Sequence, residues 1–215
     1  MTPCVSAFRW VPPVAQGYVR DHRVRWALEE AGRPYEVALV DRQVLGSADY
    51  RAWQPFGQVP AYRDGEVELF ESGAIVLHIA RSSEALAPRD EPGFARVQAW
   101  VLAALNSVEP QAQNLTSLEL HGDAAWVKDY RPVAEAALKR RLEALSAWLA
   151  GKDHLEGRFT AGDIMMTTVL RELVECGLLA QFPILDAYRQ RCEARPAFGR
   201  AIAAQIATFR ENAPS

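Results

Sequence analysis

The segment 57–73, GQVPAYRDGEVELFESG, brings together several features that can bind a ligand. Asp64-Gly65 lies between two β-prone runs and is a strong hairpin signal, and Glu71-Ser72 precedes an apolar run typical of a helix. A Ser at a helix start offers an anion its hydroxyl, a free backbone N–H and the positive end of the helix dipole. Glu71 beside it can hold a cation. We therefore expect a site for a small molecule that carries both a carboxylate and an ammonium group.

The Val-Pro step in the same segment suits a peptide joined to that charged group. An amide of the peptide could pair with the backbone of Val59, as a strand added to a sheet edge. This pairing needs the polar groups of Val59 turned outward, which a cis Val59-Pro60 bond would do at a cost of about 0.5–1 kcal/mol. Glutathione is such a ligand, with its γ-glutamyl head on Glu71 and Ser72. By themselves, a Val-Pro step is usually a turn and a Ser at a helix start is usually a cap; their order around a hairpin favours binding.

The elements that must position these residues alternate between strand and helix in the first part of the chain. The pattern predicts a strand over 4–11, a helix over 18–31, a strand over 35–40, a short helix, the hairpin and a helix over 74–80. This is the order of a thioredoxin-like α/β domain, which we expect to span residues 1–83. Residues 84–93 are rich in Pro and charge and are typical of a linker. Residues 94–215 have helical periodicity and predict an all-α domain.

A capping box marks the start of one helix of the predicted all-α domain. Thr160 is the expected N-cap and Asp163 lies three residues later, before an apolar helix over 164–175. Its physical role is in folding, because it closes the first backbone N–H groups of a buried helix. We therefore assign neither residue to chemistry.

Together, the Gln-Val-Pro, hairpin and Glu-Ser series and the capping box resemble the glutathione transferases over nearly the whole chain. The resemblance implies a homodimer that transfers the glutathione thiolate to a small hydrophobic electrophile. It implies no metal or organic cofactor, since glutathione is the cosubstrate. The residues expected to bind glutathione are Val59, Pro60, Glu71, Ser72 and Gln58.

Thiol activation is the point at which the chain departs from the family pattern. Lowering a thiol pKa from near 8.5 by about 2 units requires roughly 2.7 kcal/mol. The family usually supplies a Tyr, Ser or Cys at the end of the first strand or the start of the first helix, but residues 8–13, FRWVPP, contain no hydroxyl. Tyr18 and Arg20 are the remaining polar candidates near the helix start.

Arg20 lies four residues before Val24, on the core-facing stripe of the predicted helix. A guanidinium there would be costly to bury without an anion and could donate to the glutathione sulfur. The segment is also similar to a group of bacterial transferases that use an arginine here. The alternatives are that Arg20 pairs with an acid for structural reasons, and that Tyr18 either activates the thiol or lines the electrophile pocket.

The sequence leaves the rest of the ligand contacts open. Four residues before the Val-Pro step could contact the glycyl carboxylate: Gln54, Arg42, Arg51 and Trp53. The resemblance favours Gln58, since the family often has Gln just before the residue that precedes the proline. The electrophile is expected between the domains, against Trp100, Leu105 or Asn106, although aromatic residues at helical spacing are more often core.

Composition excludes several other function classes. The net charge of −3 and pI near 5.9 give no footprint for nucleic acid or an anionic membrane. The basic clusters, Arg20 with Arg23 and Arg25 and residues 139–141, are interpreted most simply as solvated helix faces. No secretory signal or membrane span is evident at the N-terminus or elsewhere, so a cytoplasmic location is expected. The three cysteines and four histidines have neither disulfide-framework nor zinc-site spacing.

Two further functional hypotheses remain beside conjugation. The same site would serve a glutathione-dependent isomerase, dehalogenase or peroxidase. The missing hydroxyl would also suit a non-catalytic, transferase-like interaction module, but the retained peptide-binding set argues against a pure scaffold.

Overall fold

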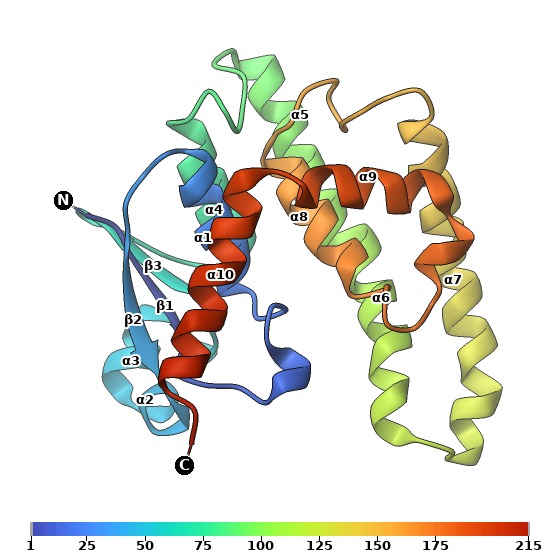
Figure 1. Ribbon diagram of the computed structural model, residues 1–215, viewed down its shortest axis with the longest axis horizontal. Coiled ribbons are helices and arrows are strands. Elements are labelled where there is room, and N and C mark those ends of the chain that lie inside the picture. The colour runs from blue at the N-terminus through green and yellow to red at the C-terminus, as the bar shows by residue number, and fades with distance from the viewer. Residues whose placement is uncertain (1, 215) are drawn as a thin grey trace. The chain divides into compact units, whose positions relative to one another are not determined.

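The computed structural model describes residues 2–214 (Figure 1). Its contacts divide the chain into two compact units. The first contains the residues up to Arg89 together with those from Arg195 onward, and the second is Asp90–Ala194.

The first unit is built on a four-stranded sheet in the order β2-β1-β3-β4. Its strands are β1 (Cys4–Phe8), β2 (Glu36–Val40), β3 (Ala61–Asp64) and β4 (Val67–Phe70). β1 is parallel to β2 and antiparallel to β3, and β3 pairs with β4 in the predicted hairpin. Gly65 has φ 63° in the hairpin turn, a conformation that favours glycine. This mixed sheet confirms the predicted thioredoxin-like arrangement.

Helices accompany this sheet. They are the 3₁₀ turn η1 (Pro13–Ala15), α1 (Asp21–Glu30), α2 (Arg42–Gly46), α3 (Ala48–Trp53), α4 (Ser72–Arg81) and α10 (Pro196–Glu211). α1 packs against both α4 and α10, and in Figure 1 the red α10 runs alongside it. Helical spacing predicts an inward stripe of Val24, Ala27, Leu28 and Ala31, of which the first three are fully buried and Ala31 is partly buried. Because α1 has neighbours on several sides, its polar residues 21–23 and 25 are buried as well.

The second unit is helical throughout its regular structure, as predicted. It contains α5 (Glu91–Leu102), the π-helical segment η2 (Ala103–Val108), α6 (Glu109–Thr116), η3 (Ser117–His121), α7 (Ala125–Leu149), α8 (Ala161–Arg171), η4 (Leu179–Gln181) and α9 (Pro183–Glu193). α8 is its central helix: residues 161–170 are all buried, and α8 packs against both α5 and α9. None of the described helices is both long and apolar enough to cross a bilayer.

The capping box at the start of α8 is confirmed. Thr160 N and Oγ1 both donate to Asp163 Oδ2, at 2.8 and 3.0 Å. Two donors that the sequence did not reveal share the other oxygen, since Leu155 N and the Tyr188 hydroxyl lie 3.0 and 2.8 Å from Oδ1. Asp163 therefore joins the loop before α8, the start of α8 and α9 through one buried carboxylate.

Several predicted boundaries differ from the structure. The first strand ends at Phe8 rather than residue 11, and α1 begins at Asp21, so that Tyr18 lies in the preceding turn. α5 begins at Glu91, inside the expected linker. By contacts, α10 belongs to the first unit, because helical periodicity identifies a helix but not the surface on which it packs. The division into folding domains 1–83 and 94–215 joined by 84–93 stays a prediction.

Substitution Asp163→Ala should lower the free energy of unfolding by about 3 kcal/mol, because it removes a helix cap and leaves further buried donors unpaired. The control is Asp90→Ala at the start of α5, where the carboxylate accepts a single 2.8 Å hydrogen bond from Gly93 N. That change should cost only about 1 kcal/mol. Urea unfolding of both variants measures the difference, and equal losses would contradict the role of Asp163 beyond capping.

Candidate functional site

The Val59-Pro60 peptide bond is cis, as the proposed binding mode requires. The Val59 side chain is 8% exposed and packs with Val40 and Tyr50. Within residues 2–214, no hydrogen bond uses the N–H or the C=O of Val59. A buried side chain thus anchors a peptide unit whose polar groups have no partner in the described chain.

A chain of hydrogen bonds holds both sides of this peptide unit. The Tyr50 hydroxyl lies 2.7 Å from the Gln58 carbonyl and 2.7 Å from Ser6 Oγ. A carbonyl can only accept, so Tyr50 donates to Gln58 and must accept from the Ser6 hydroxyl. Ser6 Oγ in turn accepts from Ala61 N at 2.7 Å. This relay joins the residue before Val59 to the residue after Pro60, and burial raises the pKa of Tyr50, which keeps its proton in place.

The helix start of the predicted site is also formed. Ser72 is the first residue of α4 and is 5% exposed, and the exposed Glu71 precedes it. Glu71 has φ 68° and ψ 115°, a region costly for a residue other than glycine, by about 1–3 kcal/mol. Its carbonyl accepts from Ile75 N at 3.0 Å, but its side chain caps no helix N–H. Backbone strain of this kind is concentrated at functional sites, and the binding of a ligand by Glu71 and Ser72 stays a prediction.

The interpretation of Arg23 and Arg25 as a solvated helix face is wrong. Their side chains are only 3% and 1% exposed, since α1 is covered by its neighbours. Arg25 Nε forms an ion pair with Asp21 Oδ2 at 2.7 Å, and burial raises the pKa of Asp21 although Arg25 opposes this. Arg23 Nη1 donates to Ser72 Oγ at 3.4 Å. No local pattern in the sequence predicts this contact, because α1 and α4 are brought together only by the tertiary fold.

Tyr18 and Arg20 lie in the turn that leads into α1, which we call the 17–21 turn. Tyr18 is 38% exposed and Arg20 is partly buried at the N-cap position of α1. Val19 between them packs against the cluster of Val40, Tyr50 and Val59. The turn is thus attached by its apolar residue to the cluster that anchors the cis peptide unit.

A buried glutamine from the far end of the chain fixes the 17–21 turn. Gln205 on α10 is fully buried. Its Oε1 accepts from Gly17 N at 3.1 Å, and its Nε2 donates to the Val19 carbonyl at 3.2 Å and to Asp21 Oδ1 at 2.7 Å. One side-chain amide therefore binds both ends and the middle of the turn. The sequence does not predict these hydrogen bonds, because the partners are more than 180 residues apart.

Two of the four candidates for the glycyl carboxylate have structural roles. Trp53 Nε1 donates to the Tyr62 carbonyl at 3.1 Å, and the buried Gln54 accepts from Gln58 N at 3.1 Å. Arg42 and Arg51 are exposed, and Arg51 Nη1 donates to the Pro55 carbonyl at 3.3 Å. Which residue contacts the glycyl carboxylate, including the exposed Gln58, stays a prediction.

In the second unit, Trp100 of the predicted electrophile set is held structurally. Its indole Nε1 donates to Glu156 Oε1 at 2.8 Å, and its ring lies 5.2 Å from that of Trp148. Leu105 is half-buried and Asn106 is exposed, and their role toward an electrophile stays a prediction.

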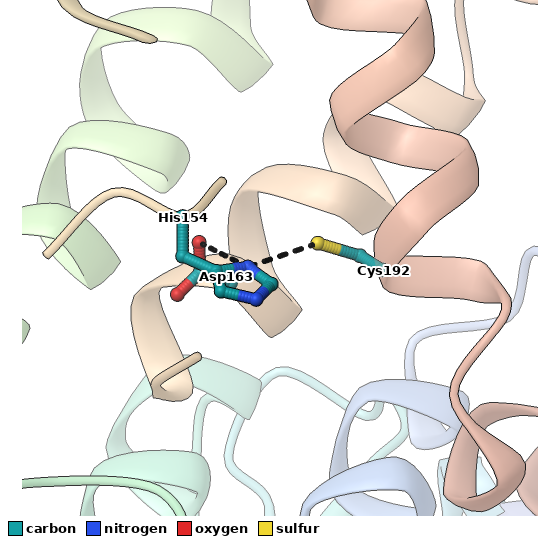
Figure 2. Close-up of side chains that lie close together, drawn as sticks. All are labelled: His154, Asp163 and Cys192. Atoms are coloured by element: carbon teal, nitrogen blue, oxygen red, sulfur yellow. Dashed lines mark hydrogen bonds and ion pairs between the residues drawn. The ribbon is translucent and has the colours of Figure 1, made fainter. Parts of the chain in front are cut away.

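His154, Asp163 and Cys192 lie close together in the second unit (Figure 2). His154 Nδ1 is 3.9 Å from Asp163 Oδ1 and 3.9 Å from Cys192 Sγ. In a catalytic relay, one ring nitrogen of the histidine would face the nucleophile, Cys192, and the other would face the orienting carboxylate, Asp163. Here Nδ1 faces both residues, so the geometry of such a relay is not present. A metal is disfavoured too, because both Asp163 oxygens already accept two hydrogen bonds each. The cluster is therefore structural.

Comparison with known proteins agrees with this architecture. The model of the glutathione S-transferase N-terminal domain matches residues 15–81, and that of the C-terminal domain matches residues 112–196. Glutathione S-transferase 4 of Zea mays is 30% identical over 211 residues, which cover 91% of each chain. The chain belongs to the glutathione S-transferase family. The family and the fold predicted from the sequence are both confirmed.

Solved structures of glutathione transferases extend the comparison. A glutathione transferase from Burkholderia graminis, with two glutathione molecules bound per subunit, has a TM-score of 0.78 and 25% identity, covering 94% of this chain and 88% of its own. Poplar glutathione transferase F1 has a TM-score of 0.81 over 96% of this chain and 99% of its own, and at 19% identity it supports the fold alone.

Substitution Gln205→Ala should loosen the 17–21 turn, because three hydrogen bonds to it are lost while α10 itself is retained. We expect amide hydrogen exchange at Gly17 to accelerate about tenfold or more, which corresponds to about 1.4 kcal/mol of lost protection. The control on the same helix is Thr208→Ala, whose hydroxyl donates only to the Ala204 carbonyl of α10. Unchanged exchange at Gly17 in Gln205→Ala would show that the amide does not hold the turn.

Proposed function

We propose that the protein is a glutathione transferase that adds the glutathione thiolate to small hydrophobic electrophiles. The observation that carries the proposal is the Val59 peptide unit. Its N–H and C=O have no partner within residues 2–214, and the relay through Ser6 and Tyr50 fixes the backbone on both sides. An extended peptide can add two antiparallel hydrogen bonds there, which suits the cysteinyl residue of glutathione.

The γ-glutamyl head is assigned to the start of α4. Its α-carboxylate would accept from the Ser72 hydroxyl and the first backbone N–H groups of the helix, where the dipole favours an anion. The exposed carboxylate of Glu71 would receive the ammonium group. Gln58 and Pro60 complete the set along the same segment, and the Burkholderia relative with bound glutathione supports this ligand class.

Reactivity is assigned to the 17–21 turn, with Arg20 as the group that stabilises the thiolate and Tyr18 as the second candidate. The attachment of Val19 to the Val59 cluster supports this assignment, because it ties the turn to the cysteinyl site. The thiol would release its proton to solvent, and a guanidinium would donate to the sulfur anion. The sulfur would then bond to an electrophilic carbon, and a leaving group would depart with its electron pair or the adduct would take up a proton.

We also infer the second substrate, the oligomeric state and the cellular location of the protein. The family supports a homodimer and a hydrophobic electrophile as second substrate, and we infer a cytoplasmic location with no metal cofactor. Isomerisation, dehalogenation and peroxide reduction would use the same thiolate, so a panel of substrates separates them from conjugation.

Glutathione binding tests the proposal directly by titration calorimetry. The wild type should bind glutathione in the micromolar to millimolar range, and Ser72→Ala should weaken binding about tenfold through loss of a hydrogen bond to a charged group. The matched control is Ser82→Ala at the other end of α4, whose hydroxyl donates to the Ile79 carbonyl and should leave binding unchanged. Absence of any binding heat at millimolar glutathione would rule out every glutathione-dependent function, including the three alternative reactions.

The pH profile of conjugation tests the thiol-activating group. Arg20→Ala should raise the apparent pKa of the bound thiol by up to about 2 units, because the cation that favours the thiolate is lost. Arg20→Lys should retain part of the effect, and Tyr18→Phe should leave the profile in place. A shift in Tyr18→Phe with none in Arg20→Ala would reverse the assignment.

A further inference from the structure

The direction of one hydrogen bond can be deduced at the start of α4. Arg23 is buried on α1, and its Nη1 lies 3.4 Å from Ser72 Oγ. A guanidinium has no acceptor, so Ser72 must accept from Arg23. The hydroxyl proton of Ser72 therefore points away from Arg23 and is available for a different acceptor.

Ser72 is also not used as an ordinary helix cap. A capping Ser precedes the helix and accepts from an N–H of the first turn. Here Glu71 occupies the cap position, and Ser72 is already the first helical residue. Its oxygen accepts from a side chain of another helix instead, so the hydroxyl is oriented by Arg23 and not by the backbone of α4.

We propose that Arg23 is a positioning residue that holds the Ser72 hydroxyl as a donor toward the α-carboxylate of the γ-glutamyl group. The inference rests on the proposed function and adds a residue to it. Without Arg23, the hydroxyl can rotate and turn a lone pair toward the carboxylate, which is repulsive. With Arg23 donating to one lone pair, the orientation that aims the proton at the carboxylate is favoured, and the guanidinium charge adds to the positive end of α4. The site thereby selects for a ligand with a free α-carboxylate.

The test uses two substitutions that differ in hydrogen-bond direction. Lys can only donate, as Arg does, whereas Gln can also accept from the Ser72 hydroxyl and reverse it. The ligands are glutathione and 4-aminobutyryl-cysteinyl-glycine, which lacks the α-carboxylate. Calorimetry of the full-length protein gives both affinities, and steady-state kinetics separates KM for glutathione from kcat.

We expect Arg23→Gln to weaken glutathione binding about tenfold, to leave binding of the analogue within about twofold, and to retain kcat at saturating glutathione. Arg23→Lys should restore most of the affinity for glutathione. In the Ser72→Ala background, Arg23→Gln should add little, because the effect acts through that hydroxyl. The control for general loss of a buried arginine is Arg25→Gln, which should lower stability without changing the preference for glutathione over the analogue.

Equal weakening of both ligands by Arg23→Gln would show a merely structural role and overturn the inference. Unchanged glutathione binding would overturn it as well. If Arg23→Gln does not fold, Arg23→Lys decides, since a loss of glutathione affinity as large as that in Ser72→Ala would contradict the donor argument. Failure of the wild type to bind glutathione would instead reject the proposed function itself.

Discussion

The hydrogen-bond relay through Ser6 and Tyr50 is the constraint on which the backbone conformation of residues 58–61 depends. A peptide unit that leaves its N–H and C=O open to a ligand loses the backbone pairing that normally fixes a loop. The relay replaces that pairing at Gln58, before Val59, and at Ala61, after Pro60. The chain is therefore held on both sides, while the polar backbone groups of Val59 have no partner among the described residues. The direction of the relay follows from the Gln58 carbonyl, which can only accept, and burial raises the pKa of Tyr50, so the hydroxyl keeps the proton that it donates.

A second constraint comes from α10, which makes the end of the sequence part of the first unit. Gln205 adds hydrogen bonds to an N–H, a carbonyl and a carboxylate in or beside the 17–21 turn. Each of these hydrogen bonds contributes about 0.5–1.5 kcal/mol to holding the turn in its irregular conformation. The position of Tyr18 and Arg20 is therefore determined by a residue that lies almost 190 positions later in the chain.

Local signals explain what the sequence could predict. The hairpin at Asp64-Gly65, the helix start at Ser72 and the capping box at Thr160 each depend on residues within a few positions of one another, and all are present in the structure. The burial of Arg23 and the contacts of Gln205 depend on which helix covers α1. Helical periodicity does not show which other helix covers α1, and it therefore predicts wrongly that the charged residues on α1 face solvent. The predicted start of α1 at residue 18 is also too early, because Gln205 of α10 holds residues 17–21 in a turn. That contact has no local signal in the sequence.

The arginines on and before α1 differ in their burial and in their partners, which bears on the roles proposed for them. Arg25 is neutralised by Asp21 at 2.7 Å and stabilises the helix, whereas Arg23 reaches α4 and contacts the hydroxyl of Ser72. Arg20 precedes them in the turn and is the most exposed of the three. A cation near a thiolate must be accessible to the ligand, but a cation that orients a hydroxyl works best when its own geometry is fixed by burial. The gradient of burial from Arg20 to Arg25 therefore suits the roles proposed for them, from contact with the reacting atom, through orientation of a binding group, to support of the fold.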